Sequence, residues 1–274
     1  MTTTTQLIKF DADALGTLQQ RRGFLATLAM AAGATALAPM LLQSGRFGSS
    51  LLAQSAQCNF PALTGWADRE ALTDVQILNF ALVLEYLEAT FYLRAESRGA
   101  LPMGASVADL DPDGMGMPGR VPGLESVRPP LPATFNVMQF VRTVRNHEIE
   151  HVLFLQNALG ASALPRSLFA FDFGNAYSSA SRFLAVAQIL EDVGVTAYLG
   201  QVGNIDNTGI LAAAGSIAGV EAEHAAGFRL INRDKITPNN VAFDMRRTSD
   251  EVIALASPFI TAPNPVPPAS SFPT

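Results

Sequence analysis

The sequence predicts an all-α protein built around a four-helix bundle. Four long stretches carry apolar residues at helical spacing, and no run alternates convincingly as a strand. The second pair of stretches also repeats glutamate, histidine and tyrosine positions of the first pair. We therefore expect a signal and linker over 1–55, one bundle domain over 70–235, and a short helix with a Pro-rich tail over 236–274.

The composition allows a large buried core. Hydrophobic residues make up 49% and charged residues 15% of the 274 positions, which excludes a disordered chain. The net charge of −6 and the lack of a basic patch argue against nucleic acid as a partner. Because Cys58 is the only cysteine, a disulfide framework and a Cys-based metal site are excluded. The three histidines, His147, His151 and His224, are the only candidates for imidazole chemistry.

The amino terminus predicts export. Residues 21–25 read Arg-Arg-Gly-Phe-Leu, and an uncharged, Ala-rich stretch follows through Gly45. This arrangement resembles a twin-arginine export signal of bacteria, which carries folded proteins. Two motifs, 34–36 and 53–55, are candidate cleavage sites, and we expect the protein in the periplasm or cell envelope. The apolar run of about 20 residues can also cross a bilayer, so a retained membrane anchor is the alternative.

Capping residues and glycines predict where the helices begin and end. The expected helices are 74–97, 135–159, 179–200, 208–232 and a short fifth helix over 248–256. The residues expected to begin them are Thr73 or Asp74, Thr134, Ser178 or Ser179, Asn207 and Ser249. Their side-chain oxygens can accept hydrogen bonds from free N–H groups of the first turn. Gly160 ends the second helix and Gly200 the third, and the tail from Ser257 is expected to be irregular.

The connections predict how the helices are arranged. Residues 98–133 form a long insertion rich in Gly and Pro. The segment 160–178 can extend to roughly 60 Å, whereas a 25-residue helix is about 38 Å long, so this segment can cross the whole bundle. The short turn over 201–207 makes the third and fourth helices antiparallel neighbours.

An internal duplication places chemically similar residues in register. Residues 84–93 align with 190–199, because both contain Leu-Glu, then Thr, then Tyr-Leu at the same offsets. Residues 148–151, Glu-Ile-Glu-His, align with 221–224, Glu-Ala-Glu-His. Side chains three residues apart lie on the same face of a helix, so the Glu and the His of each Glu-x-x-His pair can bind one metal ion together.

Each of the four helices has a glutamate in an otherwise apolar stripe. These acids are Glu85, Glu148, Glu191 and Glu221. A buried carboxylate without a partner costs several kcal/mol. No Lys or Arg lies within four residues of Glu85, Glu191 or Glu221. Two divalent cations would balance the four negative charges with both imidazoles neutral, and this balance predicts a dinuclear metal site.

The ligand pattern resembles that of ferritin-like dinuclear carboxylate proteins, in which two helices give one Glu each and two give Glu-x-x-His. The Glu-x6-Tyr spacing is also typical of that superfamily, and the stretch 77–88 is most similar to the secreted desiccation-related group. The resemblance covers about 70–235 and implies six metal ligands: Glu85, Glu148, His151, Glu191, Glu221 and His224. The long insertion departs from compact ferritins and argues against a closed iron-storage shell.

Several neighbouring side chains have weaker assignments. Glu88 lies one turn from Glu85, but its repeat partner is Gly194, so we expect a flanking acid rather than a ligand. Tyr92 and Tyr198 are expected to hydrogen-bond the ligands or to act as redox neighbours, with ordinary core tyrosines as the alternative. The remaining polar side chains are expected on the surface: His147, Glu150, Asp192 and Glu223.

These features together predict an exported protein with two bound divalent metal ions. Iron is the first choice and manganese the second, because carboxylate oxygens with two imidazoles suit these ions better than copper or structural zinc. The expected chemistry is redox reaction with dioxygen or peroxide, or iron oxidation, and the resemblance implies a role in desiccation or stress tolerance. The alternatives are a non-catalytic structural or interaction bundle of the envelope, and iron sequestration. The sequence leaves open whether the protein is an enzyme and whether it forms a homodimer.

Overall fold

The computed structural model describes residues 69–112, 121–237 and 242–274. The expected export signal, its cleavage motifs and Cys58 lie outside the described residues.

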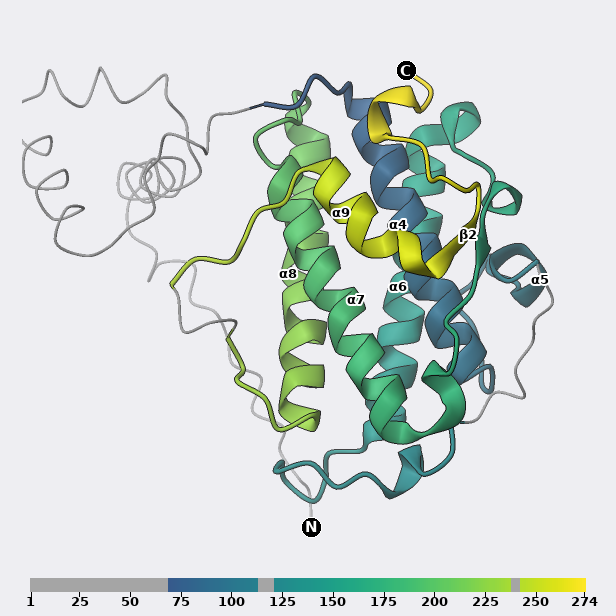
Figure 1. Ribbon diagram of the computed structural model, residues 1–274, viewed down its shortest axis with the longest axis vertical. Coiled ribbons are helices and arrows are strands. Elements are labelled where there is room, and N and C mark those ends of the chain that lie inside the picture. The colour runs from purple at the N-terminus through teal and green to yellow at the C-terminus, as the bar shows by residue number, and fades with distance from the viewer. Residues whose placement is uncertain (1–68, 113–120, 238–241) are drawn as a thin grey trace, which may run out of the picture. The chain divides into compact units, whose positions relative to one another are not determined.

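Four long helices form a bundle, which confirms the predicted all-α fold (Figure 1). They are α4 (Asp74–Ala95), α6 (Val137–Leu159), α7 (Ala180–Gln201) and α8 (Thr208–Ile231). The closest packing is between α4 and α6 and between α7 and α8, so the duplicated halves of the sequence form two helix pairs. Fewer contacts join α6 to α8 or α4 to α7, and the buried acids described below lie where the two pairs meet.

The connection between α6 and α7 runs from one end of the bundle to the other, as predicted. Near its start, the backbone N–H of Leu164 donates to the side chain of Asn79, which lies close to the beginning of α4. Near its end, the hydroxyl of Tyr177 donates to the carbonyl oxygen of Phe91, close to the end of α4. Part of this crossover covers α4, which explains why α4 is buried on all sides.

Helix starts follow side-chain caps, with two corrections to the predicted residues. Thr73, Ser179 and Asn207 cap α4, α7 and α8 as expected. In contrast, α6 begins after Asn136, whose side chain accepts from the N–H of Gln139, so Thr134 is not its cap. The short helix α9 (Ser249–Ala256) begins after Thr248, which forms a reciprocal capping box with Glu251. Thr248 rather than Ser249 is therefore the cap.

The insertion and the connections also contain short helical turns. The insertion holds the short helix α5 (Val107–Leu110). Single 3-10 turns occur at Leu124–Ser126, Gly160–Ser162, Arg166–Leu168, Ala176–Ser178, Ser257–Phe259 and Ala269–Ser271. The Gly/Pro-rich stretch 113–120 of the insertion lies outside the described residues.

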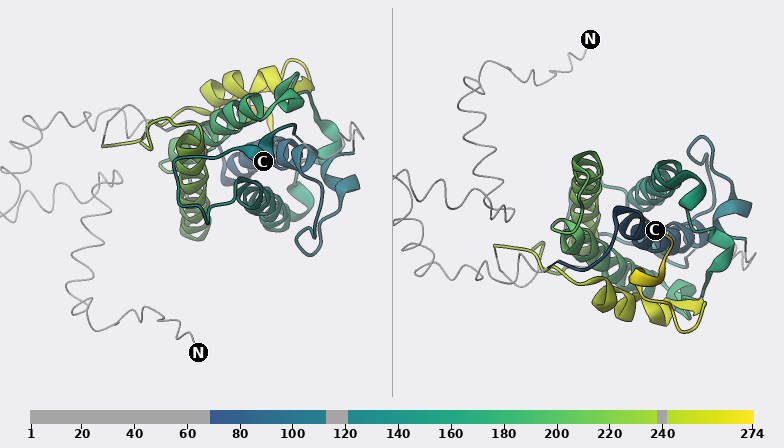
Figure 2. Two further views of the ribbon diagram at one scale, coloured as in Figure 1. Left: turned by 90° about the horizontal axis from the view of Figure 1, so that it is seen from below. Right: turned by 90° about the horizontal axis from the view of Figure 1, so that it is seen from above.

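A two-stranded antiparallel sheet corrects the prediction that the chain has no strand and that its tail is irregular. It pairs β1 (Ala170–Phe171) in the crossover with β2 (Ile260–Ala262) in the tail. Strands of two and three residues are too short to show an alternating pattern in the sequence. The tail then packs on α4, where the amide of Gln76 donates to the carbonyl oxygens of Ser270 and Phe272. Figure 2 shows α9 and the tail on one side of the bundle.

Buried arginines fasten the insertion to the bundle. Arg94 of α4 pairs with Asp111 at 2.6 Å, and both side chains are buried. Arg145 of α6 donates to three backbone carbonyl oxygens that follow α4, those of Glu96, Arg98 and Ala100. These bonds give the buried Arg145 guanidinium its acceptors and hold the chain that follows α4 against α6.

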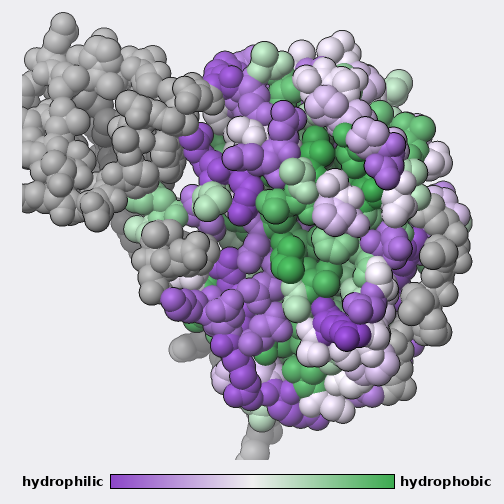
Figure 3. Space-filling model, in the orientation of Figure 1, coloured by the Kyte–Doolittle hydropathy of each residue, from purple (hydrophilic) through white to green (hydrophobic). Residues whose placement is uncertain are grey.

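The outer surface has both polar and apolar regions. Figure 3 shows apolar side chains on the face formed by α7 and α9, where Ile189 and Leu255 are 51% and 43% exposed. Among the described residues, one helix, α7, is long and apolar enough to cross a membrane. Its most apolar 18-residue stretch is 61% buried within the protein, so α7 has the environment of a core helix of a bundle.

Candidate metal centre

Each helix of the bundle places one glutamate at the same level of the core. The four acids are Glu85 of α4, Glu148 of α6, Glu191 of α7 and Glu221 of α8. All four are fully buried among apolar side chains. The duplicated pattern therefore produces a single convergent cluster at the meeting of the two helix pairs rather than two separate surface patches.

The cluster contains two groups of side chains that can hold a metal ion. One group is Glu85, Glu148, His151 and Glu221, and the other is Glu148, Glu191, Glu221 and His224. Within each group the ligand atoms lie within 4.8 Å of one another. Glu148 and Glu221 belong to both groups and so occupy the positions of bridging ligands. The structure thus brings together all six residues that were predicted as ligands.

The carboxylate oxygens of the two shared acids fit a bound cation. Glu148 Oε1 and both side-chain oxygens of Glu221 are buried and accept no hydrogen bond of good geometry among the described residues, although a histidine Nδ1 lies 2.9 Å from Glu148 Oε1 and 3.3 Å from Glu221 Oε1. Leaving a buried oxygen unsatisfied is costly, and a cation between the two acids would remove that cost. These oxygens belong to Glu148 and Glu221, the two residues that both metal groups share.

Both predicted histidine ligands turn the same ring atom toward the acids. His151 Nδ1 lies 3.1 Å from Glu148 Oε2 and 3.3 Å from Glu85 Oε2. His224 Nδ1 lies 2.9 Å from Glu148 Oε1 and 3.1 Å from Glu191 Oε2. Nδ1 is therefore the nitrogen that each imidazole offers to an ion.

His147 lies beside the cluster rather than on the surface, contrary to the expectation from sequence. Its Nδ1 is 2.9 Å from Nε2 of His224, and the two rings stack with centroids 5.1 Å apart. His147 therefore contacts the nitrogen of His224 that faces away from the acids, which fixes the orientation of the ring. The i, i+4 spacing of His147 and His151 was the signal that could have placed it near this face.

The two tyrosines bind acids across the bundle. The hydroxyl of Tyr198 donates to Glu85 Oε1 at 2.5 Å, and the hydroxyl of Tyr92 donates to Glu191 Oε1. The sequence predicted hydrogen bonds to ligands but placed each tyrosine on the stripe of the acid in its own helix. In the structure each tyrosine reaches the equivalent acid of the other repeat.

Glu88 brings a fifth carboxyl group to the cluster. It is buried, and an ideal Cβ at Gly194 would lie 3.4 Å from Glu88 Oε1 and 2.9 Å from Glu221 Oε2. Glu88 therefore occupies space that a side chain at position 194, its counterpart in the second repeat, would fill. The remaining acids near these helices lie away from the cluster: Glu150 and Glu223 are exposed, as predicted, whereas Asp192 is half-buried in an ion pair with Arg229.

A family model for the ferritin-like domain matches residues 73–233. The chain belongs to this family. The match begins at the cap of α4 and ends just beyond α8, so it spans the four helices that carry the cluster. No curated protein matches the chain.

Burial sets the protonation of this ferritin-like cluster in the absence of metal. It raises the pKa of Glu85 to about 7 and also raises the pKa values of Glu191 and Glu221. The pKa of Glu88 is raised well above its usual range by burial and by the charges of the surrounding carboxylates. The surroundings of Glu88 therefore favour its protonated form.

The histidines partly compensate the acids when no metal is bound. Burial lowers the pKa of His224, but the carboxylates of Glu191 and Glu148 outweigh it and raise the pKa to about 11. The pKa of His151 rises for the same reason. Burial would raise the pKa of Glu148, yet the two imidazoliums hold it well below its usual range. Metal binding at Nδ1 must therefore displace protons from both rings.

Proposed function

We propose that this ferritin-like protein is an exported oxidoreductase with a dinuclear iron or manganese centre that reacts with dioxygen or peroxide or oxidises iron. The observation that carries the proposal is that three buried carboxylate oxygens on Glu148 and Glu221, the acids common to both groups, accept no hydrogen bond of good geometry. The donor set of oxygens and two imidazoles favours iron or manganese. Such ions supply the electrons for reduction of dioxygen or peroxide when they are bound.

The charges of the cluster support two divalent ions. Four ionised glutamates balance two divalent cations if both histidines are neutral and Glu88 remains protonated. Burial beside four other carboxyl groups favours the protonated form of Glu88. Glu85, Glu148, His151, Glu191, Glu221 and His224 would hold the ions, with Glu148 and Glu221 shared.

The residues around the centre orient its ligands and exclude water. Tyr198 and Tyr92 hold one oxygen each of Glu85 and Glu191, which leaves the second oxygen of each acid directed at a histidine. The protonated carboxyl group of Glu88 lies within the same apolar core and can give or take a proton there. Full burial of the four glutamates keeps bulk water from their carboxylate oxygens, whereas the His151 side chain is 12% exposed.

The export part of the proposal rests on residues 21–25, which precede the apolar run. A twin-arginine route would let the bundle fold and acquire metal in the cytoplasm before export. The similarity of residues 77–88 to desiccation-related proteins supports a role in stress tolerance. Replacing both Arg21 and Arg22 by Lys should keep the protein out of the periplasmic fraction, and unchanged fractionation would refute this route.

Metal analysis with matched variants tests the centre itself. The wild-type protein should contain about two ions per chain, and its ferrous form should be oxidised when peroxide or dioxygen is added. Glu148→Gln should lose metal, whereas Glu150→Gln, an exposed acid two residues away, should retain it. Equal metal content in the two variants would show that the ligands are assigned wrongly.

The same measurements separate the alternative functions. Tightly bound metal without oxidation would indicate a structural site in a non-catalytic bundle. Accumulation of many ions per chain would indicate iron sequestration. Absence of metal in a folded protein would leave only the interaction bundle.

A further inference from the structure

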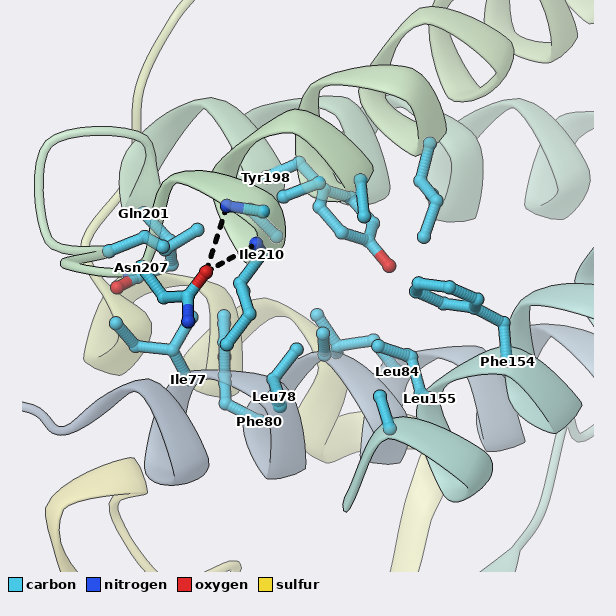
Figure 4. Close-up of a pocket in the computed structure, with 18 residues that line it drawn as sticks. Ile77, Leu78, Phe80, Leu84, Phe154, Leu155, Tyr198, Gln201, Asn207 and Ile210 are labelled. Carbon is cyan, nitrogen blue, oxygen red and sulfur yellow. Dashed lines mark hydrogen bonds between the residues drawn. The ribbon is translucent and has the colours of Figure 1, made fainter. Parts of the chain in front are cut away.

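An apolar cavity lies beside the candidate metal centre. Its volume is about 260 Å³, and residues from all four bundle helices line it. Figure 4 shows the phenol ring of Tyr198 and the ring of Phe154 on its walls, together with Leu78, Leu84 and Leu155. An apolar cavity of about 150 Å³ is already large enough to bind benzene. The space here therefore exceeds what a small organic molecule requires.

The inner wall of the cavity is continuous with the first metal group. Tyr198 lines the cavity, and its hydroxyl donates to Glu85 Oε1 at 2.5 Å. Leu84 directly precedes Glu85, and Ile217 lies one helical turn before Glu221. A molecule in the cavity therefore contacts side chains that adjoin or hold the metal ligands.

The outer wall opens toward solvent between α6 and α8. Phe154 is 44% exposed, and Ala158 and Gly209 at the same end are also exposed. Small residues of α8, including Ala213 and Ala214, leave the space open. A ligand can therefore enter from outside without unfolding a helix.

The lining selects against charged ligands. None of the lining residues is acidic, basic or histidine. Of the polar ones, Tyr198 is bonded to Glu85, Gln201 donates to Glu70, and Asn207 caps α8. A charged ligand would lose its hydration here without gaining a counter-charge, which is a large cost. Burial of an alkyl chain would instead be favourable, because it removes apolar surface from water.

We propose that this cavity binds an uncharged organic molecule with an alkyl chain and holds one end of it against Tyr198, at the edge of the metal centre. Binding itself depends only on the cavity. That the bound molecule is a substrate of the centre rests on the proposed function. With peroxide as the oxidant the step would balance, because one oxygen atom of peroxide would enter a C–H bond of the ligand to give an alcohol and the other would leave as water.

Titration of the metal-free full chain with 1-octanol tests the binding site. Isothermal titration calorimetry should detect 1-octanol, and octanoate, of the same length but charged, should bind more weakly by about tenfold or more. Failure to bind 1-octanol, or equal affinity for the two compounds, would overturn the proposal.

Two alanines in adjacent positions of α8 provide a matched pair of variants. Ala213 lines the cavity, whereas Ala212 is exposed and does not. Ala213→Phe should fill the space and weaken 1-octanol binding by about tenfold or more, while Ala212→Phe should leave it unchanged. If circular dichroism shows that Ala213→Phe does not fold, Ala158→Phe on α6 takes its place. Unchanged affinity in the folded cavity variant would overturn the proposal.

Cobalt loading tests whether the ligand reaches the centre. 1-Octanol should change the visible absorption of the Co²⁺-loaded wild type, and not that of the cavity variant. Binding without a spectral change would overturn the placement against Tyr198. If the protein takes up neither Co²⁺ nor iron or manganese, the proposed function fails, and the titration of the metal-free chain still decides whether the cavity binds 1-octanol.

Discussion

The hydroxyl of Tyr198 donates to Glu85 Oε1 at 2.5 Å, so a tyrosine of the second repeat positions a glutamate of the first. Conversely, the hydroxyl of Tyr92 in the first repeat donates to Glu191 of the second repeat. The two bonds connect α4 and α7, which also pack together where the ring of Phe91 stacks on that of Phe183. Each repeat is therefore incomplete without the other, and the ligand geometry depends on the packing of the two helix pairs.

Tyr198→Phe should weaken metal binding while leaving the fold intact. The ring would still fill its place, but Glu85 would lose the hydrogen-bond donor that orients it. Loss of such a partner typically lowers metal affinity by about 10- to 100-fold, so we expect a decrease of about tenfold. Competition with a metal chelator measures this affinity. The control is Tyr177→Phe, because Tyr177 is also buried but its hydroxyl donates to the Phe91 carbonyl oxygen. Both variants should lose about 1 kcal/mol of stability, and equal metal affinity in the two would contradict the assigned role.

Gly194→Ala should disturb the cluster from the opposite repeat. The new Cβ would lie 2.9 Å from Glu221 Oε2, so the carboxylate must shift. Because Glu221 belongs to both metal groups, we expect fewer than two ions per chain by metal analysis. Gly219→Ala on α8 is the control, since a Cβ there meets nothing within 4 Å and should stabilise the helix by up to about 1 kcal/mol. Full metal content in Gly194→Ala would show that Glu221 has room to move.

The stability of the metal-free protein should fall as pH rises. The pKa of Glu85 is raised from 4.5 to about 7, so the stability that its proton provides is present below the lower value and lost as pH rises through about 7. The pKa of His224 is raised from 6.5 to about 11, so its contribution is complete below 6.5 and lost toward 11. Thermal unfolding of the metal-free chain should therefore give a lower Tm at about pH 9 than at about pH 5.

Metal loading should reverse this trend. Bound cations require ionised acids and neutral histidines, which higher pH favours. The difference in Tm between the loaded and metal-free forms should therefore increase with pH. A metal-free Tm that rises over the same range would contradict the placement of these groups in one buried cluster.

Helical periodicity and capping chemistry made most of the bundle predictable from sequence. The cap of α8 at Asn207 was predicted correctly, and Thr73 was one of the two residues predicted to cap α4, because a side-chain oxygen directly precedes each apolar pattern. The start of α6 was not, since Asn136 and Thr134 are both good caps and the sequence does not show which one the loop geometry selects. The pairing of β1 with β2 depends on tertiary contacts between segments about 90 residues apart, which no local pattern reveals.

The sequence predicted those parts of the candidate site that depend on the spacing of residues along one helix. The repeated Glu-x-x-His pairs identified Glu148 with His151 and Glu221 with His224. The crossed tyrosine bonds and the contact of His147 with His224 depend on how the helix pairs pack, which periodicity does not determine. The same holds for Glu88, whose approach to Glu221 depends on the absence of a side chain at Gly194.

The buried pair of Arg94 and Asp111 should be a main anchor of the insertion. The Arg94 guanidinium also donates to the Phe171 carbonyl oxygen in the crossover, so one side chain connects α4, the insertion and the crossover. Asp111→Ala would leave the buried guanidinium without this carboxylate and should cost about 3–5 kcal/mol in urea unfolding of the metal-free chain. Asp109→Ala, an exposed acid in the same segment, should leave stability nearly unchanged. Replacing both members of the pair, Arg94→Met with Asp111→Leu, should recover part of the lost stability because no buried charge remains. A double variant as unstable as Asp111→Ala would show that the hydrogen bond from Arg94 to the Phe171 carbonyl oxygen, rather than the ion pair, provides the stability.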